Sequence, residues 1–363
     1  MRLSVSVVLR RPSYTAERDA RRMARRMVSI GVVGATGQVG QVMRNLLAER
    51  DFPASSVRFF ASSRSQGRTL TYRGQEIEVE DAETADPRGL DIALFSAGAT
   101  MSRVQAPRFA AAGATVIDNS SAWRKDADVP LVVSEVNFDR DVRGAKLAKG
   151  IIANPNCTTA ITLMALYPLH QAFGVKRIFA SSYQAVSGTG AKAIEELEKQ
   201  VGQIVRSEPV TREVYPHQIA FNVLPQVDSF LDSGYTKEEM KLENEGRKIM
   251  HHPGFKASVT CVRVPVYRSH SVAVSAEFDR PITVESACAV LLKAPGLDVV
   301  DNPSASQYPM PLHTSEKDNC AVGRIRMDCA LENGLSLWIC GDQLLKGAAL
   351  NAVQIAEELL KLK

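Results

Sequence analysis

The first half of the chain alternates between short apolar runs and amphipathic stretches. The apolar runs are rich in β-branched and aromatic residues, which is typical of buried strands. These runs are Val28–Val33, Val57–Ala61, Ile92–Phe95 and Ala114–Ile117. Between them, Gln38–Arg50 and Ser102–Ala112 carry apolar residues at helical spacing. Strands that alternate with helices predict βαβ units and a parallel sheet over residues 27 to 154.

The second half has longer strand-like runs and fewer helical patterns between them. Its strand-like runs are Ile178–Tyr183, Ser258–Val266, Ser271–Phe278 and Ser336–Cys340. A polar helical pattern spans Thr236–Ile249, and the last stretch, Leu344–Leu362, is a clean amphipathic helix. This order predicts an α+β domain with a mostly antiparallel sheet.

A length of 363 residues agrees with two domains, since domains average about 150 residues. No apolar stretch approaches the roughly 18 residues of a membrane helix, so we expect no membrane span. None of the six cysteines forms a CxxC pair, and no Cys/His spacing is typical of zinc. We therefore expect no metal, and reduced thiols in a cytoplasm.

Charge is distributed unevenly along the chain. Residues 1–26 hold eight arginines against Glu17 and Asp19, a formal charge of +6, while the whole chain carries +4. The remainder from Met27 is therefore slightly acidic, at −2, which argues against a nucleic-acid groove. We interpret residues 1–26 as a disordered arm or as translated sequence upstream of a start at Met27. An organelle-targeting peptide is the less favoured alternative.

Three glycines follow the first predicted strand and open a helix. Gly34 permits a tight turn, Gly37 lets the backbone approach a pyrophosphate, and Gly40 lets the helix pack closely on the strand. Exposed N–H groups at the start of a helix favour phosphate. The sequence therefore predicts a dinucleotide site, although the GxxGxxG spacing departs from the usual GxGxxG.

The loop after the second predicted strand indicates which dinucleotide is bound. An acidic residue there would bind the ribose 2′-hydroxyl of NAD, but the segment Ala61–Gly67 contains none. It offers Arg64 instead, which can pair with a 2′-phosphate, and neighbouring serines that can donate to one. This favours NADP over NAD.

Cys157 is the candidate nucleophile. It lies in Asn154–Thr159, between the buried run Gly150–Ala153 and a helical segment, Ala160–Phe173, and so at a strand-to-helix turn. A helix N-terminus stabilises negative charge, and we expect it to lower the thiol pKa.

A cysteine nucleophile needs an acid or base, and His270 is the best candidate among six histidines. It ends one strand-like run and begins the next, where a side chain can point into a cleft. Arg263 lies seven residues earlier on the same run.

These motifs together resemble aspartate-semialdehyde dehydrogenases, from Met27 to the C-terminus. In chain order the motifs are GATGQVG, NPNCTT, SSYQAVSGTG, EEMK, CVRVP…HS, VGRIR and GDQLLKGAA. The resemblance implies a reductive dephosphorylation of L-aspartyl-4-phosphate to L-aspartate 4-semialdehyde, in lysine, threonine and methionine biosynthesis. Glyceraldehyde-phosphate dehydrogenase and N-acetyl-glutamyl-phosphate reductase are related in their use of a cysteine with a histidine.

The resemblance also implies roles for particular residues. Cys157 forms a thioester, His270 is the acid/base and Gln184 orients the substrate. Arg263 would hold the substrate α-carboxylate, Glu238 would face its amino group, and Arg124 with Lys241 would bind phosphate. The residues expected to contact NADP are Gly34, Thr36, Gly37, Gln38, Val39, Gly40, Arg64, Ser65, Ser187, Gly188 and Gln343.

The implied fold is a Rossmann-like NADP-binding domain, residues 27–154 plus 343–363, with an α+β catalytic and dimerisation domain, residues 155–342. The terminal helix would pack on the first of these, and the protein would be a homodimer. Two alternatives stay open. The first is a different acyl phosphate as substrate, such as N-acetyl-glutamyl phosphate. The second is a nucleotide-binding regulator without catalysis, although such a protein would be expected to lose Cys157 or His270.

Overall fold

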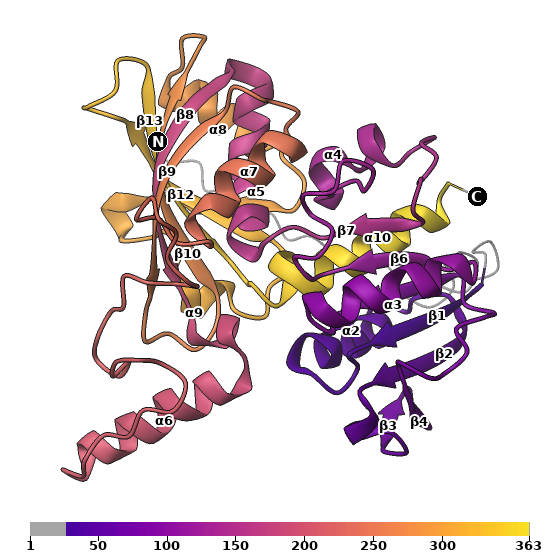
Figure 1. Cartoon of the computed structure of the whole chain (residues 1–363). Helices are drawn as coiled ribbons and strands as arrows, with labels where there is room; N and C mark the ends of the chain where they lie inside the picture. The colour runs from indigo at the N-terminus through magenta and orange to yellow at the C-terminus, as the bar shows by residue number, and fades with distance from the viewer. Residues whose placement is uncertain (1–26, 363) are drawn as a thin grey trace, which may run out of the picture.

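Two separate β-sheets organise the chain, one in each half of the sequence (Figure 1). The structure is a computed structural model, and it describes residues 27–362. The expectations for residues 1–26 therefore fall outside the described residues. Within residues 27–362, no helix is both long and apolar enough to cross a membrane.

The first sheet has seven strands in the order β3-β4-β2-β1-β5-β6-β7. Its strands are β1 (Val28–Val33), β2 (Ala54–Ala61), β3 (Thr69–Tyr72), β4 (Gln75–Asp81), β5 (Ile92–Phe95), β6 (Thr115–Asp118) and β7 (Ile151–Ala153). All neighbours are parallel except β3 and β4, which form a hairpin at one edge. The predicted parallel sheet is confirmed, with an antiparallel edge hairpin added.

Helices cover both faces of this first sheet. They are α2 (Gln38–Glu49), α3 (Ala99–Ala111), α4 (Ser134–Asp141) and the C-terminal α10 (Leu350–Leu360), with a 3₁₀ turn η1 (Ser63–Ser65) after β2. Helices α2 and α10 share one hydrophobic cluster with Val28, Ile30 and Val32 of β1, whereas α3 packs on the opposite face. The last helix of the chain thus packs against the first sheet.

The terminal segment differs from the single helix predicted for Leu344–Leu362. A π-helical turn, Leu345–Ala349, precedes α10. Within this turn the Gly347 backbone lies against Cys157, because a Cβ added to Gly347 would come within 2.7 Å of the Cys157 Cβ. The wider turn brings the chain to this close approach, and a π-turn inside a helix is often found at a functional site.

The second sheet has six strands in the order β11-β12-β13-β10-β8-β9. Its strands are β8 (Val175–Gln184), β9 (Lys256–Arg263), β10 (His270–Phe278), β11 (Leu297–Val299), β12 (Cys320–Met327) and β13 (Gly334–Gly341). The inner pairs are antiparallel as predicted, but both edge pairs, β11 with β12 and β8 with β9, are parallel. The sheet is therefore mixed, because long crossovers return the chain in the same direction: residues 185–255 join β8 to β9, and residues 300–319 join β11 to β12.

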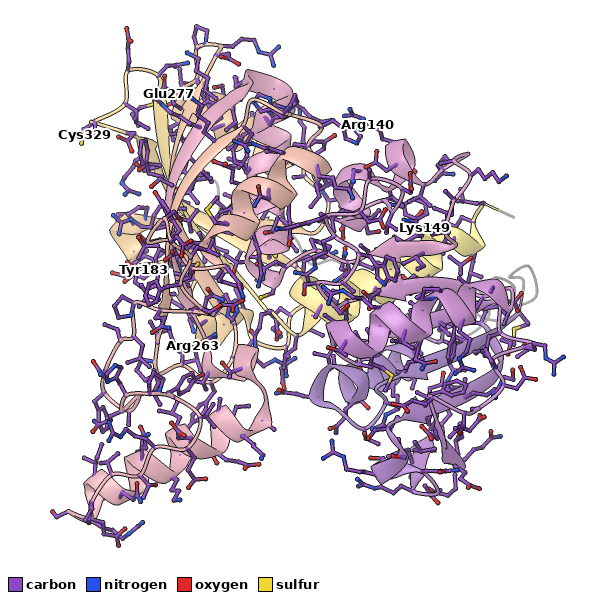
Figure 2. The ribbon with its side chains drawn as sticks, viewed as in Figure 1. Arg140, Lys149, Tyr183, Arg263, Glu277 and Cys329 are labelled. Carbon is purple, nitrogen blue, oxygen red and sulfur yellow. The ribbon has the colours of Figure 1, made fainter. Side chains whose placement is uncertain are left out.

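Three helices of the second half cover one face of the second sheet. The helices of this half are α5 (Cys157–Phe173), α6 (Ala191–Val205), α7 (Glu239–Ile249), α8 (Val284–Leu291) and α9 (Pro311–Thr314), with 3₁₀ turns η2 (Val186–Thr189) and η3 (Pro303–Ala305). Helices α5, α7 and α8 pack on the covered face, while α6 projects away from both sheets (Figure 1). On β8, Ser182 and Gln184 point to the covered side, and Tyr183 is exposed on the side remote from the first sheet (Figure 2).

Candidate active site

The glycine turn after β1 has the geometry that the sequence predicts. Gly34 has a φ of 85°, and a Cβ there would lie 2.3 Å from the Ser96 carbonyl oxygen. A Cβ on Gly40 would lie 2.1 Å from the Gly34 carbonyl oxygen, so only glycine allows α2 to pack this closely. Thr36 and Gly37 form the rest of the turn, and α2 begins at Gln38. The start of α2 is thus an open helix N-terminus of the kind that binds phosphate.

Arg64 and Ser65 lie on η1, directly after β2. β2 runs parallel to β1, and its Phe60 carbonyl accepts a hydrogen bond of 2.8 Å from Gly34 N. The loop with Arg64 therefore neighbours the glycine turn. Arg64 is exposed, and in the described part of the chain its guanidinium makes no ion pair. It is available to a phosphate group.

A cavity of about 540 Å³ lies between the two halves of the chain. Its lining from the first half includes Gly37, Gln38 and Val39 of the helix start, with Arg124. From the second half come Cys157, Ser187, Gly188 and Gln343. Gly34, Thr36, Gly40, Arg64 and Ser65 do not line this cavity, so the structure divides the expected cofactor residues into two groups.

Asn119, at the end of β6, also lines the cavity, and the sequence analysis did not identify it. Both polar atoms of its side-chain amide are buried without a hydrogen-bond partner in the structure. A buried amide of this kind is costly unless something pairs with it. A polar ligand in the cavity would supply the hydrogen-bond partners that this amide lacks.

Cys157 is the first residue of α5, four residues after β7 ends, which confirms the predicted strand-to-helix turn. Asn156 caps this helix: its side-chain oxygen accepts hydrogen bonds from the backbone N–H groups of Thr158 (3.0 Å) and Thr159 (3.3 Å). The cap fixes the direction in which the Cys157 side chain leaves the helix.

The prediction that the helix N-terminus lowers the pKa of the Cys157 thiol was wrong. Burial raises the pKa of the Cys157 thiol to about 11, and the carboxylate of Glu238 adds to the rise. The cations of Lys241, Arg124 and Arg263 act in the opposite direction but do not overcome burial. In this structure the neutral thiol is therefore the stable form at neutral pH.

His270 and Arg263 converge on Gly188. A Cβ there would lie 3.0 Å from Arg263 Nη1 and 3.3 Å from His270 Nε2. Ala185 orients both side chains, because its N–H donates to His270 Nδ1 (3.1 Å) and its carbonyl accepts from Arg263 Nη1 (2.8 Å). Two buried atoms, His270 Nε2 and Arg263 Nε, have no hydrogen-bond partner in the structure. Burial and the charge of Arg263 hold the pKa of His270 well below its usual value.

Gln343 connects the loop of Ser187 to the segment before His270. Its side-chain oxygen accepts from Ser269 N (2.8 Å), and its amide nitrogen donates to the Ser187 hydroxyl. Gln343 and Ser187 are both almost fully buried although they line the cavity. Gln343 is therefore held by protein contacts on both sides of its amide.

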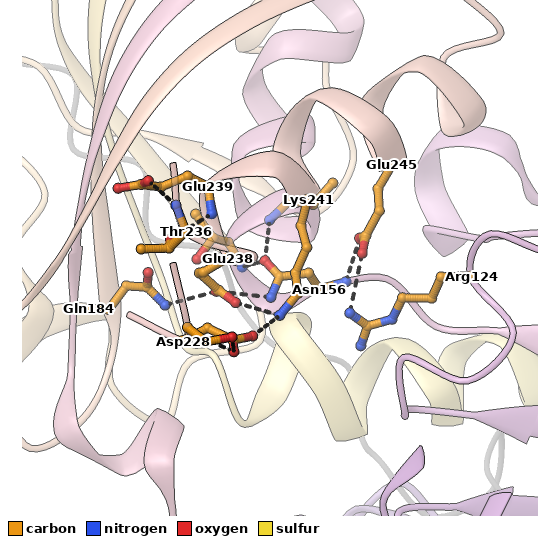
Figure 3. A network of polar contacts seen from close by, with 12 residues as sticks. Arg124, Asn156, Gln184, Asp228, Thr236, Glu238, Glu239, Lys241 and Glu245 are labelled. Carbon is orange, nitrogen blue, oxygen red and sulfur yellow. Dashed lines mark hydrogen bonds and ion pairs between the residues drawn. The ribbon is translucent and has the colours of Figure 1, made fainter. Parts of the chain in front are cut away.

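Glu238 is the centre of a buried polar network (Figure 3). It accepts hydrogen bonds from Gln184 Nε2 (3.1 Å), Asn156 Nδ2 (3.0 Å) and Lys241 Nζ (2.7 Å). Burial opposes the charge of this carboxyl, but Lys241 and the two amides prevail and lower its pKa. Lys241 also contacts Asp228 at 3.4 Å. Burial alone would lower the pKa of Lys241, but the carboxylates of Glu238 and Asp228 outweigh burial and raise it.

Arg124 extends from the first half of the chain to the same network. It makes an ion pair of 3.2 Å with Glu245 of α7 (Figure 3). It also donates hydrogen bonds to the backbone oxygens of Asn119 and Asn154. The sequence analysis identified neither Glu245 nor the roles of Asn156. Glu245 is seven residues beyond Glu238, and this helical spacing in a charged segment is the signal that could have identified it.

The chain matches two domain models that together span most of its length. Residues 29–143 match "Semialdehyde dehydrogenase, NAD binding domain", and residues 166–346 match "Semialdehyde dehydrogenase, dimerisation domain". The second match supports a homodimer.

Curated relatives and solved structures agree with these matches. The aspartate-semialdehyde dehydrogenase of Mycolicibacterium smegmatis is 58% identical, over 91% of this chain and 98% of that protein. The crystal structure of aspartate semialdehyde dehydrogenase II from Vibrio cholerae superposes with a TM-score of 0.88 at 41% identity, covering 93% of this chain and 99% of that one. The enzyme from Candida albicans, crystallised with NADP, has a TM-score of 0.73 at 26% identity, with 93% and 100% coverage.

Proposed function

The chain belongs to the aspartate-semialdehyde dehydrogenase family, and we propose that it reduces L-aspartyl-4-phosphate to L-aspartate 4-semialdehyde with NADPH, through a thioester on Cys157. One observation carries the proposal. Cys157, at a helix N-terminus, and Gly188 line one cavity, and the side chains of His270 and Arg263, each with a buried nitrogen that lacks a partner, lie against Gly188. Gly37, Gln38 and Val39, at the start of α2, line the same cavity.

Cys157 acts as the nucleophile. Its sulfur bonds to the acyl carbon, the bond from that carbon to the phosphate oxygen breaks, and the thiol proton ends on the departing phosphate. This proton transfer agrees with a Cys157 thiol that is neutral before the substrate binds. The leaving group carries about two negative charges, so cations must hold it. Arg124 lines the cavity beside Cys157, and Lys241 is near enough to affect the Cys157 pKa.

NADPH, when bound, supplies the hydride that reduces the thioester. The residues that would hold it near the reaction are Gly37, Gln38, Val39, Ser187, Gly188 and Gln343. The residues that would hold its distant end are Gly34, Thr36, Gly40, Arg64 and Ser65. Asn119, with its unpartnered amide, fits a polar group of the same ligand.

His270 acts as a hydrogen-bond donor. Because the backbone N–H of Ala185 donates to Nδ1, that nitrogen must present a lone pair, and the neutral ring carries its proton on Nε2. The Nε2–H group would then stabilise the oxyanion of the reduced thioester. When that oxyanion closes to the aldehyde, the carbon–sulfur bond breaks, and the departing Cys157 thiolate takes a proton from solvent to return to the thiol. The same contact disfavours a role as base, since a proton on Nδ1 would face the Ala185 N–H.

Arg263, Glu238 and Gln184 recognise the substrate. Arg263 has one nitrogen bound to the Ala185 carbonyl, and its unpartnered Nε is free to donate to the α-carboxylate. The ionised Glu238 suits the α-ammonium group, which an N-acetylated substrate lacks. Gln184 donates to Glu238 and so fixes that carboxylate. We also propose a cytoplasmic location, where the free thiols of the chain stay reduced.

Replacing Cys157 by alanine should abolish turnover while NADPH binding remains. The decisive assay is phosphate-dependent NADP reduction with aspartate semialdehyde, with NADPH fluorescence to measure binding. Cys329→Ala is the matched control, because that cysteine is exposed on the side remote from the first sheet (Figure 2). More than a few per cent of wild-type activity in Cys157→Ala would exclude the thioester route.

The tautomer of His270 can be observed directly. In ¹⁵N-histidine NMR spectra at pH 7, we expect its ring to be neutral with the proton on Nε2. Because its pKa lies well below the usual value, the ring should still be neutral at pH 6. The His270→Gln variant assigns the signals. A proton on Nδ1, or an imidazolium at pH 6, would contradict the donor role.

Arg64→Ala should reduce the preference for NADPH over NADH. The lost charge-assisted contact is worth about 1.5–3 kcal/mol, roughly tenfold to a hundredfold in affinity. The measurement is the ratio of KM for the two cofactors. Arg68→Ala, an exposed arginine four residues later, is the control and should leave the ratio unchanged. An unchanged ratio in Arg64→Ala would mean that other residues recognise the 2′-phosphate.

Arg263→Lys should lower kcat/KM for aspartate semialdehyde by about a hundredfold, because an ammonium cannot reproduce the fork of a guanidinium on a carboxylate. NADP affinity should stay unchanged. Steady-state kinetics with the semialdehyde varied at saturating NADP and phosphate test this. Arg177→Lys, on the exposed side of β8, is the control. A change below about threefold would remove Arg263 from the substrate site.

A further inference from the structure

Helix α7 holds two segments that meet at Cys157. One oxygen of Glu245 pairs with Arg124 Nη1 at 3.2 Å, and the other accepts the backbone N–H of Asn156 at 2.7 Å. Glu245 is buried, with 6% of its surface exposed. A single carboxylate thus joins the loop of Arg124 to the residue that directly precedes Cys157.

The next turn of α7 holds the main chain of the same loop. The ammonium group of Lys248 donates to the carbonyl oxygens of Arg124 (3.1 Å), Asp126 (2.6 Å) and Val129 (2.7 Å). Three acceptors satisfy the three donors of a lysine. The loop is therefore attached to α7 both through the Arg124 side chain and through its backbone.

These contacts leave Arg124 with one orientation. Its Nε donates to the Asn154 carbonyl (2.9 Å), its Nη2 to the Asn119 carbonyl (2.8 Å) and its Nη1 to Glu245. A guanidinium has five N–H groups, so two are left for a ligand in the cavity that Arg124 lines. Each of its three nitrogens is tied to the protein.

We propose that Glu245 is a positioning residue for the phosphate step: it aims Arg124 at the phosphate and fixes the Asn156 turn that presents Cys157. This inference rests on the proposed function, which places phosphate at Arg124. A carboxylate near a site for a dianion repels the ligand, so its presence requires a compensating role. Its two directed contacts supply that role.

The Glu245→Gln variant separates positioning from simple packing. Glutamine has nearly the same shape but only one acceptor oxygen, so its NH₂ group would face either Arg124 or the Asn156 N–H, both of which are donors. Glu243 of the same helix is a closely matched control. It also pairs with an arginine, Arg247 at 2.8 Å, and accepts a backbone N–H, that of Ala257 at 2.9 Å, but these partners belong to α7 and β9 and not to the loops of Arg124 and Asn156.

The first readout is independent of turnover. Inorganic phosphate should protect Cys157 from alkylation by iodoacetamide, and mass spectrometry identifies the labelled cysteine. In Glu245→Gln we expect the half-protecting phosphate concentration to rise about tenfold or more, because misplacement of a binding group by about 1 Å has effects of this size or larger. Glu243→Gln should match the wild type.

The second readout is kinetic. In phosphate-dependent NADP reduction, KM for phosphate should rise about tenfold in Glu245→Gln, while KM for NADP stays constant. A packing role alone would lower the melting temperature and leave phosphate protection and KM unchanged, and that result would overturn the inference. If Glu245→Gln does not fold, Glu245→Asp decides: it keeps the charge on a shorter side chain. A rise in the half-protecting concentration supports the inference, and wild-type protection overturns it.

The wild-type enzyme in the same assay distinguishes failure of the proposed function from failure of the positioning role alone. Without phosphate-dependent NADP reduction by the wild type, the proposed function itself fails. With normal wild-type activity and unchanged phosphate behaviour in the Glu245 variants, only the positioning role fails.

Discussion

The arrangement of the site depends on how Asn156 is held. Its side-chain oxygen caps α5, its side-chain nitrogen donates to Glu238, its backbone N–H donates to Glu245 and its carbonyl accepts from Ala160 N at 2.9 Å. Every polar group of this buried residue is therefore used. Because Asn156 directly precedes Cys157, these contacts fix the sulfur relative to α7. The same contacts connect the proposed nucleophile to Glu238 and Glu245, and through them to Lys241 and Arg124.

The raised pKa of Cys157 lowers the reactivity of its thiol. A thiolate reacts with oxidants and alkylating agents, whereas a neutral thiol does so slowly. Burial keeps Cys157 neutral although Arg124, Lys241 and Arg263 all lie close enough to oppose it. The proposed substrate, an acyl phosphate, suits such a thiol, because the departing phosphate can take up the proton. The raised pKa thus slows reaction of Cys157 with other electrophiles.

Local features of the site could be predicted from sequence, and long-range ones could not. The glycine turn at Gly34 and the helix start at Cys157 depend on a few adjacent residues, so the sequence pattern was sufficient. Glu245 lies 121 residues from Arg124 and 89 from Asn156, so its helical spacing from Glu238 could mark the residue but does not indicate these partners. The parallel edges of the second sheet were missed for the same reason, since strand direction there is set by crossovers. The thiol pKa depends on burial, which the sequence around Cys157 does not reveal.

Helix α7 fixes the distance between Glu238 and Glu245, which lie at two ends of the site. Glu238 directly precedes the helix, Lys241 lies in its first turn and Glu245 two turns beyond Glu238, on the same face. The hydrogen bonds exchanged between Thr236 and Glu239 stabilise the start of the helix and so the position of Glu238. A helix rises about 1.5 Å per residue and hardly stretches. The end that suits an ammonium group and the end that holds Arg124 are therefore at a constant separation, which a pair of loops could not maintain as well.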